Sequence, residues 1–233
     1  MFFPWIEEHI LLICLIFATA IGCGWLWIFR HRLQIPSSLI PVMSALNTAA
    51  GVVCVKLFAG LETWGNPLES GQSLFGSIFL LPIVYFIGAR LFRRPFYDVF
   101  DVFVMCTITT LIFARIACIV SGCCQGQFLP GSESLRWPTR ELEIIFHIGL
   151  LIFFYIKNRK GTQLGELWPL YMIAYGSFRF CEEWLRAGEL VFGPFHYGHI
   201  WAVLSAIIGS AVYLELREQR SKVEYKNVKK QFR

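Results

Sequence analysis

Long apolar segments that recur along the whole chain constrain the fold more than any other feature of the sequence. A helix rises about 1.5 Å per residue, so roughly 20 residues are needed to cross the hydrocarbon core of a bilayer. Segments of about this length are too numerous here to form the core of one soluble domain. We delimit seven of them, at residues 10–29, 39–59, 74–91, 100–120, 142–156, 167–184 and 200–214. The pattern predicts an all-α, multi-pass membrane protein with about seven transmembrane helices.

Charged residues are scarce and lie in short clusters, which fits the same class of protein. They make up 16% of the chain, whereas soluble domains carry roughly 25%. We expect one helical bundle over residues 1–216, followed by a basic tail over residues 217–233.

The distribution of basic residues predicts the orientation, because Lys and Arg stay preferentially on the cytoplasmic side of a membrane. The connections after the first, third and fifth segments, together with the tail, hold 15 of the 21 Lys and Arg residues. The opposite connections hold the acids Glu7, Glu8, Glu62 and Glu69. We therefore expect the N-terminus outside and the C-terminus in the cytoplasm. The net charge of +5 follows from this topology and does not predict nucleic-acid binding.

Charged side chains inside or beside apolar segments are costly, so each is a candidate functional residue. The first such cluster begins with Arg115, near the outer end of the fourth segment, and continues to Gly126. A guanidinium there suits a phosphate or a carboxylate, because its planar fork donates two parallel hydrogen bonds. The alternative is that Arg115 extends to the membrane interface without a ligand.

The second cluster precedes the fifth segment and spans residues 137–143, with Arg140 and Glu141 inside it. Thr139 can cap a helix that starts here, which would place Glu143 in the first turn, where the helix dipole favours a negative charge. The alternative is that Glu143 pairs with an arginine from another helix.

The third cluster spans residues 175–186 at the end of the sixth segment. Arg179 and Glu183 are four residues apart, and Glu183 and Arg186 are three apart, so the three share one helix face. A buried ion cluster is costly to keep unless it serves a function. The alternative is a salt bridge at the membrane interface.

These three clusters resemble the signatures of the bacterial prolipoprotein diacylglyceryl transferase family. The family motif Tyr-Gly-x-x-Arg-Phe-x-x-Glu-Phe-x-Arg is matched closely by residues 175–186. Pro138, Thr139 and Glu143 match a second motif, and Arg115 and Gly126 match the family's arginine and glycine-rich stretch. The resemblance covers roughly residues 70–215 in the right order.

The resemblance implies a reaction in the bacterial plasma membrane. The family moves the diacylglyceryl group of phosphatidylglycerol to the cysteine thiol of a lipobox-bearing preprotein and releases glycerol phosphate. It implies that Arg115 and Arg179 hold the phosphate, that Glu183 orients Arg179 and that Tyr175 donates a hydrogen bond. Substrate binding is expected to involve Glu143, Arg186, Gly126 and Arg140. No cofactor and no metal ion is expected.

The sequence also departs from the family pattern. Residues 73–77 stand where the family has Ser-Phe-His-Gly-Gly, so Phe75 replaces the histidine that would take a proton. Cys118 stands where the family has an asparagine near the motif arginine. A Gly-Cys-Cys-x-Gly run at residues 122–126 places the chain among divergent members. His147, His196 and His199 are the remaining imidazoles that could approach the site.

The cysteines support other hypotheses. Cys118, Cys123 and Cys124 cluster near the outer end of the fourth segment, where a neighbouring cation would favour a thiolate. They are candidates for a nucleophile or a redox group, and Cys123 or Cys124 could form a disulfide with Cys118 or Cys181. A thiol-dependent acyl transferase, a redox protein and a non-catalytic lipid-binding or transport protein therefore remain alternatives to the transferase.

Overall fold

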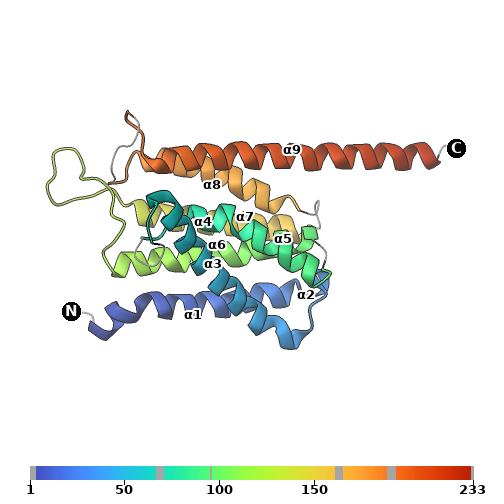
Figure 1. The fold of residues 1–233 in the computed structure, drawn as a ribbon, viewed down its shortest axis with the longest axis horizontal. Coiled ribbons are helices and arrows are strands. Elements are labelled where there is room, and N and C mark those ends of the chain that lie inside the picture. Colours follow the sequence, from blue (N-terminus) through green and yellow to red (C-terminus); the bar gives the residue numbers. More distant parts are fainter. Residues whose placement is uncertain (1–3, 67–70, 95, 161–164, 188–192, 232–233) are drawn as a thin grey trace.

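The computed structural model describes residues 4–66, 71–94, 96–160, 165–187 and 193–231, and the side chains of residues 9–222 within these ranges. The chain folds into helices that run nearly parallel to one another (Figure 1). Their bounds are α1 Pro4–Ile28, α2 Arg30–Leu33, α3 Ile40–Thr63, α4 Phe75–Phe79, α5 Leu81–Leu91, α6 Phe96–Val120, α7 Thr139–Arg159, α8 Leu167–Glu183 and α9 Tyr197–Gln231. A 3-10 turn, Ser37–Leu39, leads into α3.

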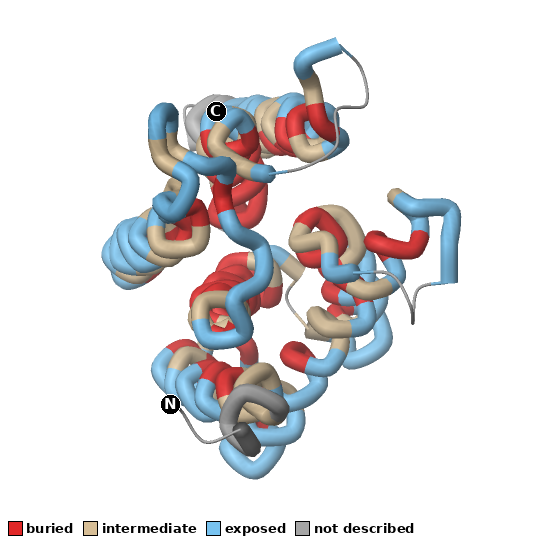
Figure 2. Tube along the Cα trace, turned by 90° about the vertical axis from the view of Figure 1, so that its left-hand side faces the viewer, coloured by how far each residue is buried: buried red, intermediate tan, exposed pale blue. Residues whose placement is uncertain are grey.

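Helix α6 forms the centre of the bundle. It contacts α1, α3, α5, α7 and α8, and most of its residues are buried. An end-on view shows the buried residues on the inward faces of the helices (Figure 2). Apart from the charged residues near its two ends, α6 carries mainly apolar residues on all sides, as expected of a helix in such a core.

The outer faces of the helices are apolar as well. Within the described residues, four spans are long and apolar enough to cross a membrane, at His9–Ile28, Ser37–Thr63, Phe96–Val120 and Tyr197–Lys222. A shorter apolar stretch covers Phe75–Leu91. Large exposed side chains such as Ile16, Leu57 and Ile207 are explained by contact with lipid, because water would disfavour so much apolar surface. The protein is therefore an all-helical, multi-pass membrane protein.

Each expected segment lies on a helix, but several boundaries differ from the prediction. The first helix starts at Pro4, before residue 10, and the last continues to Gln231, past residue 214. The expected third segment is divided at Leu80 into α4 and α5. Pro82 lies in the first turn of α5, where its missing N–H does no harm, whereas it could not continue α4. Glu69 lies outside the described residues, as do the side chains of Glu7 and Glu8.

Helices α8 and α9 pack closely along their length. An added Cβ at Gly176 would lie 2.6 Å from the carbonyl oxygen of Ala202, and one at Gly209 would lie 2.7 Å from the Cβ of Met172. Glycine at these two positions therefore lets the two backbones approach. The C-terminal part of α9 extends beyond the rest of the bundle (Figure 1).

The bundle has two distinct ends. At one, called the loop end, α6 and α8 finish and α7 and α9 begin. At the opposite end, α1 and α7 finish and α6 and α8 begin (Figure 1). The two ends hold the main charged clusters of the protein.

The opposite end is closed by a polar network around Asp101 of α6. Its carboxylate accepts N–H bonds from Gly165, at 2.7 Å, and Leu167, at 3.0 Å. Arg32 of α2 lies 2.6 Å from Asp98 and 3.5 Å from Asp101, and it also bonds Asn158 of α7. The network ties α2, α6, α7 and the start of α8 together.

Candidate functional site

A cavity of about 600 Å³ lies at the loop end of the bundle. Residues from the end of α3, the start of α4, α6, α8 and the start of α9 line it, so the site depends on the whole bundle. Three arginines face it, namely Arg115, Arg179 and Arg186. A cavity with three guanidinium groups at the end of a membrane bundle is suited to an anion.

Arg115 is held by a carboxylate from another helix. Its Nε forms an ion pair with Glu143 of α7, and the hydroxyl of Tyr175 donates to the other carboxylate oxygen at 2.9 Å. Arg115 and Glu143 are both buried. The pairing confirms the alternative reading of Glu143, in which it meets an arginine from another helix.

The expected helix cap at Thr139 is wrong. Helix α7 begins at Thr139 itself, Pro138 occupies the capping position, and no side chain caps the helix there. Glu143 consequently lies beyond the first turn of α7, and the acidic residue within that turn is Glu141. The role of Glu143 comes from Arg115 and Tyr175 and not from the helix dipole.

Arg179 is held by two carboxylates of its own helix. It pairs with Glu182 and, at 2.8 Å, with Glu183, as residues three and four apart on one helix do. The carboxylate of Glu183 also lies 3.6 Å from Nδ1 of His196. An added Cβ at Gly198 would collide with this carboxylate, so the glycine leaves the space that Glu183 occupies.

The sequence placed Arg186 on one helix face with Arg179 and Glu183, but in the structure its ion-pair partner is a different carboxylate. Arg186 follows the end of α8, and its nearest carboxylate is that of Glu182, at 3.9 Å. Glu182 is buried and pairs with both arginines, although it was not among the residues expected from the sequence. Its spacing of three from Arg179 and four from Arg186 was a readable signal.

The loop between α6 and α7 brings three thiols together. The Sγ atoms of Cys118, Cys123 and Cys124 all lie within 4.8 Å of one another. Arg140 holds this arrangement by donating hydrogen bonds of 3.2 Å to the carbonyl oxygens of Cys118 and Cys123. Its guanidinium is directed to the loop backbone and is not among the groups that line the cavity.

The hydrogen bond from Cys118 lowers the pKa of the Cys124 thiol well below its usual value. The guanidinium groups of Arg115 and Arg186 lower that pKa further, although partial burial opposes the shift. Cys124 lines the arginine cavity, so a thiolate at this position faces the same space as the arginines.

Gly126 fixes the loop against the end of α8. It forms an isolated bridge with Arg186, and the neighbouring Gln127 donates its N–H to Leu185 at 2.8 Å. A Cβ added at Gly126 would collide with the carbonyl oxygens of Trp137 and Leu185. Gly126 therefore packs beside the cavity and does not line it.

Comparison with known proteins gives the family. The model of the family described as "Prolipoprotein diacylglyceryl transferase" matches residues 7–215, which is most of the chain. This chain belongs to that family. The expectation from the three sequence clusters is confirmed.

Individual relatives are distant. A protein of Dehalococcoides mccartyi is 24% identical over 221 residues, which cover 84% of this chain and 85% of the relative. Proteins of Polaromonas and Campylobacter hominis are 27% and 28% identical over 160 residues, covering 61% and 63% of this chain and 58% and 57% of the relatives. Each relative is named phosphatidylglycerol–prolipoprotein diacylglyceryl transferase.

In this member of the transferase family, Phe75 faces the cavity where the resemblance placed a histidine. Its ring packs edge-on against that of Tyr175, with the centroids 6.0 Å apart. His147 lies behind this wall, fully buried, and bonds Tyr171 at 3.3 Å. His196, which the sequence did not distinguish from His147, lines the cavity.

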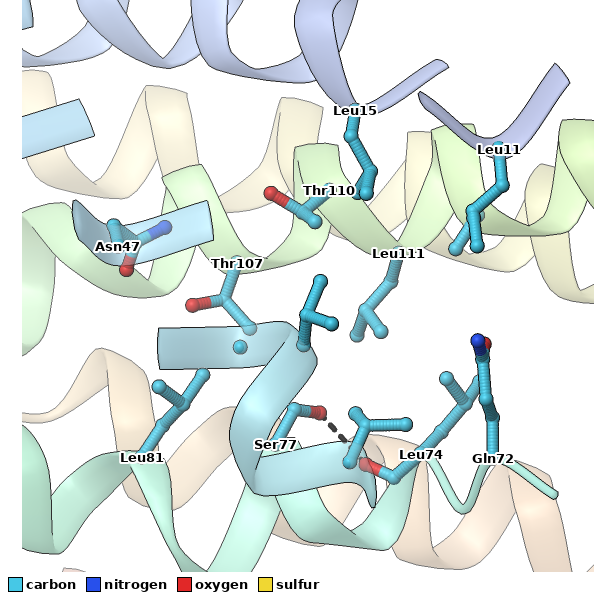
Figure 3. Close-up of a pocket in the computed structure, with 14 residues that line it drawn as sticks. Leu11, Leu15, Asn47, Gln72, Leu74, Ser77, Leu81, Thr107, Thr110 and Leu111 are labelled. Atoms are coloured by element: carbon cyan, nitrogen blue, oxygen red, sulfur yellow. Dashed lines mark hydrogen bonds between the residues drawn. The ribbon is translucent and has the colours of Figure 1, made fainter. Parts of the chain in front are cut away.

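An apolar pocket adjoins the cavity of this transferase-family protein. Leucines from α1, α5 and α6 line it together with the polar side chains of Asn47, Gln72 and Thr107 (Figure 3). The two spaces share Gln72 and Leu74. The apolar pocket has a volume of only about 40 Å³, against about 600 Å³ for the arginine cavity, so the larger space is the one that can hold a ligand.

Proposed function

We propose that this protein is a membrane enzyme that transfers the diacylglyceryl group of phosphatidylglycerol to the cysteine thiol of a lipobox-bearing preprotein, with release of glycerol phosphate. The observation that carries the proposal is the set of three arginines, Arg115, Arg179 and Arg186, that line one cavity in a bundle of this family. The reaction needs cations of this kind, because the departing group is a phosphate.

Arg115 and Arg179 hold the phosphate of the lipid. A planar guanidinium donates two hydrogen bonds to phosphate oxygens, and the donors are already oriented before the lipid arrives. Glu143 orients Arg115, while Glu182 and Glu183 orient Arg179. These carboxylates compensate the buried charges of Arg115 and Arg179. The third cation of the cavity, Arg186, is paired only weakly, because its contact with Glu182 is 3.9 Å long.

The transfer is a displacement at the glyceryl carbon that carries the phosphate. The thiolate of the acceptor forms a C–S bond to this carbon as the C–O bond breaks, and the electron pair leaves on the phosphate oxygen. Arg115 and Arg179 stabilise the charge that develops there. His196 takes the thiol proton, because it is the imidazole that faces the cavity among the described residues, and Glu183 lies beside it.

Several residues act by positioning others. Tyr175 fixes the carboxylate of Glu143 through its hydrogen bond. Arg140 and Gly126 hold the loop that closes one side of the cavity, the first by bonding the loop backbone and the second by close packing.

The same proposal includes the topology. Seven segments cross the bacterial plasma membrane, with the N-terminus and the loop end outside and the C-terminus in the cytoplasm. Residues 1–216 form the bundle, and residues 217–233 form the basic cytoplasmic tail, whose cations suit anionic headgroups. In this orientation the arginine cavity opens toward the outer leaflet and toward preproteins that have crossed the membrane.

The test is a transfer assay with the purified protein in detergent, phosphatidylglycerol and a synthetic lipobox peptide. We expect a thioether-linked peptide, detected by mass spectrometry, together with an equal amount of glycerol phosphate. The matched control is the same peptide with serine in place of the cysteine, which should give no product. Bound phosphatidylglycerol without any thioether product would contradict the transferase.

That contrary result would support the second candidate, a lipid-binding or transport protein that has kept the family's anion site. Phe75 is the observation in its favour, because a phenyl ring cannot take a proton at the position where the resemblance placed histidine. Binding of phosphatidylglycerol that depends on Arg179, without turnover, is the outcome expected of such a protein.

A further inference from the structure

The thiols of Cys118, Cys123 and Cys124 form a compact group that the phosphate chemistry leaves without a role. Their Sγ atoms lie within 4.8 Å of one another, and no fourth His, Cys, Asp or Glu ligand atom joins them among the described residues. Zinc binds thiolate sulfur at about 2.3 Å, so three thiolates on one tetrahedral zinc ion lie roughly 3.8 Å apart. Each pair of sulfurs must therefore close by no more than about 1 Å to share an ion.

The backbone of the loop holds the three cysteines in place. Cys124 has φ 55° and Gly122 has φ 68°, and a non-glycine residue in this left-handed region is strained. Arg140 binds the carbonyl oxygens of both Cys118 and Cys123 and so ties the end of α6 to the loop. Strain of this kind, kept by specific contacts, is typical of functional sites.

The thiols also face open space. All three line a cavity of about 380 Å³ that they share with Arg115, and Cys124 lines the larger arginine cavity as well. Three thiols that were simply packed in the core would be buried, whereas Cys123 and Cys124 are exposed and Cys118 is partly exposed. The group is accessible both to an ion and to a substrate in either cavity.

We propose that Cys118, Cys123 and Cys124 bind one zinc ion and leave one coordination position for the sulfur of the acceptor cysteine. Three protein ligands and one open position are the usual composition of a catalytic zinc site, whereas structural sites are closed by four. Three soft thiolates favour zinc or monovalent copper over magnesium or calcium. Of these, zinc undergoes no redox change, so it is the ion that suits a displacement reaction.

Zinc binding by the three cysteines is independent of the proposed transferase function, and only the role of the open position as the site of the acceptor cysteine rests on it. Coordination at the open position would convert the acceptor thiol to a thiolate. This would supply the nucleophile in a site where Phe75 stands in place of the expected histidine. The proton passes to His196 or to water. The thiolate forms the C–S bond as the C–O bond to phosphate breaks, and the three protein cysteines are unchanged at the end.

Metal binding is tested on the full-length protein in detergent, reduced and then dialysed against buffered free zinc. We expect one zinc per chain by elemental analysis. Cobalt put in place of zinc should give the intense thiolate-to-metal absorption of a tetrahedral site. Cys118→Ser, Cys123→Ser and Cys124→Ser should each weaken zinc binding at least tenfold.

The matched control is Cys181→Ser, which removes an exposed cysteine outside the group and should bind zinc like the wild type. Absence of stoichiometric metal would overturn the site, as would zinc that persists in all three serine variants. A disulfide between two of the three cysteines, found by mass spectrometry in protein isolated without reductant, would overturn it too.

The open position is tested with the cobalt-loaded protein and the lipobox peptide. We expect the cysteine peptide to shift the cobalt absorption and the serine peptide to leave it unchanged, and an unchanged spectrum with both would overturn the acceptor role. Arg179→Ala should keep the zinc and the spectral shift but lose the transfer. Because metal content and spectra need no turnover, failure of the transferase and failure of the zinc site give different results.

Discussion

Both ends of the bundle hold arginines paired with buried carboxylates, but the two clusters are built differently. At the opposite end, one arginine serves two aspartates, and backbone N–H groups of Gly165 and Leu167 complete the bonds of Asp101. At the loop end, three arginines line a cavity of about 600 Å³, and the carboxylates that hold them lie behind or beside them.

On the proposed function, this difference separates a charge cluster that stabilises the fold from one that binds a ligand. Around Asp101 the protein supplies the donors itself and joins four helices, so the charges stabilise the fold. Around Arg115 and Arg179 the carboxylates orient the cations while the cavity remains accessible, so the charges are available to a ligand. The composition of the two clusters is similar, and access to the cavity distinguishes them.

The largest effect that this comparison predicts is for Arg179→Ala. Removing an oriented donor from the position where charge develops costs about 10²–10³-fold in kcat, and we expect a loss of this size in the transfer assay. Arg179→Lys keeps the charge but loses the planar fork, so it should retain intermediate activity and show that the alanine variant is not merely unfolded. Activity close to wild type in the alanine variant would place the phosphate elsewhere.

The next effect is on stability at the opposite end. Asp101→Ala leaves the buried N–H groups of Gly165 and Leu167 without an acceptor, and it should lower the free energy of unfolding by about 3 kcal/mol. Thermal unfolding in detergent measures this change. Molecules that remain folded should transfer at the wild-type rate, and a selective loss of turnover without destabilisation would remove the distinction between the two clusters.

Tyr175→Phe should have a smaller effect, confined to the loop end. It removes the hydrogen bond of 2.9 Å to Glu143, which is worth about 1.5 kcal/mol for a charged acceptor and corresponds to roughly a tenfold loss of kcat/KM. Tyr171→Phe is the matched control, because its hydroxyl contacts His147 at 3.3 Å. Equal losses in both variants would indicate a general packing effect.

The smallest effect is expected for Arg220→Ala. Arg220 lies 2.6 Å from Glu166, but Lys157 lies 3.2 Å from the same carboxylate and can keep it paired. A partly exposed ion pair contributes less than about 1 kcal/mol, so melting temperature and transfer should both stay near wild type. A large loss of activity here would show that charges far from the cavity also act on the reaction.

Much of the fold could be predicted because its helices are continuous apolar segments of the right length. The division at Leu80 was also readable, since Pro82 marks the start of a new helix. The ion pair between Arg115 and Glu143 was not, because it joins two helices whose relative placement is set by tertiary packing. The sequence could offer it only as one of two alternatives.

The individual site residues were predictable to different degrees. Arg179 and Glu183 followed from helical spacing, and Glu182 could have been found by the same rule. No local signal distinguished His196 from His147. His196 faces the cavity and His147 is buried, and both environments arise only when the bundle has formed. The proximity of the three thiols depends on the left-handed backbone of Cys124, which its residue type does not predict.

Helix α9 is longer than the hydrocarbon core of a bilayer is thick. Its 35 residues make a rod of about 52 Å at 1.5 Å per residue, whereas the hydrocarbon core is about 30 Å thick. Roughly 20 Å of rigid helix is then left over beyond the lipid tails. Energy transfer from a fluorescent group near its end to a lipid dye would measure how far this part of the helix stands from the membrane surface.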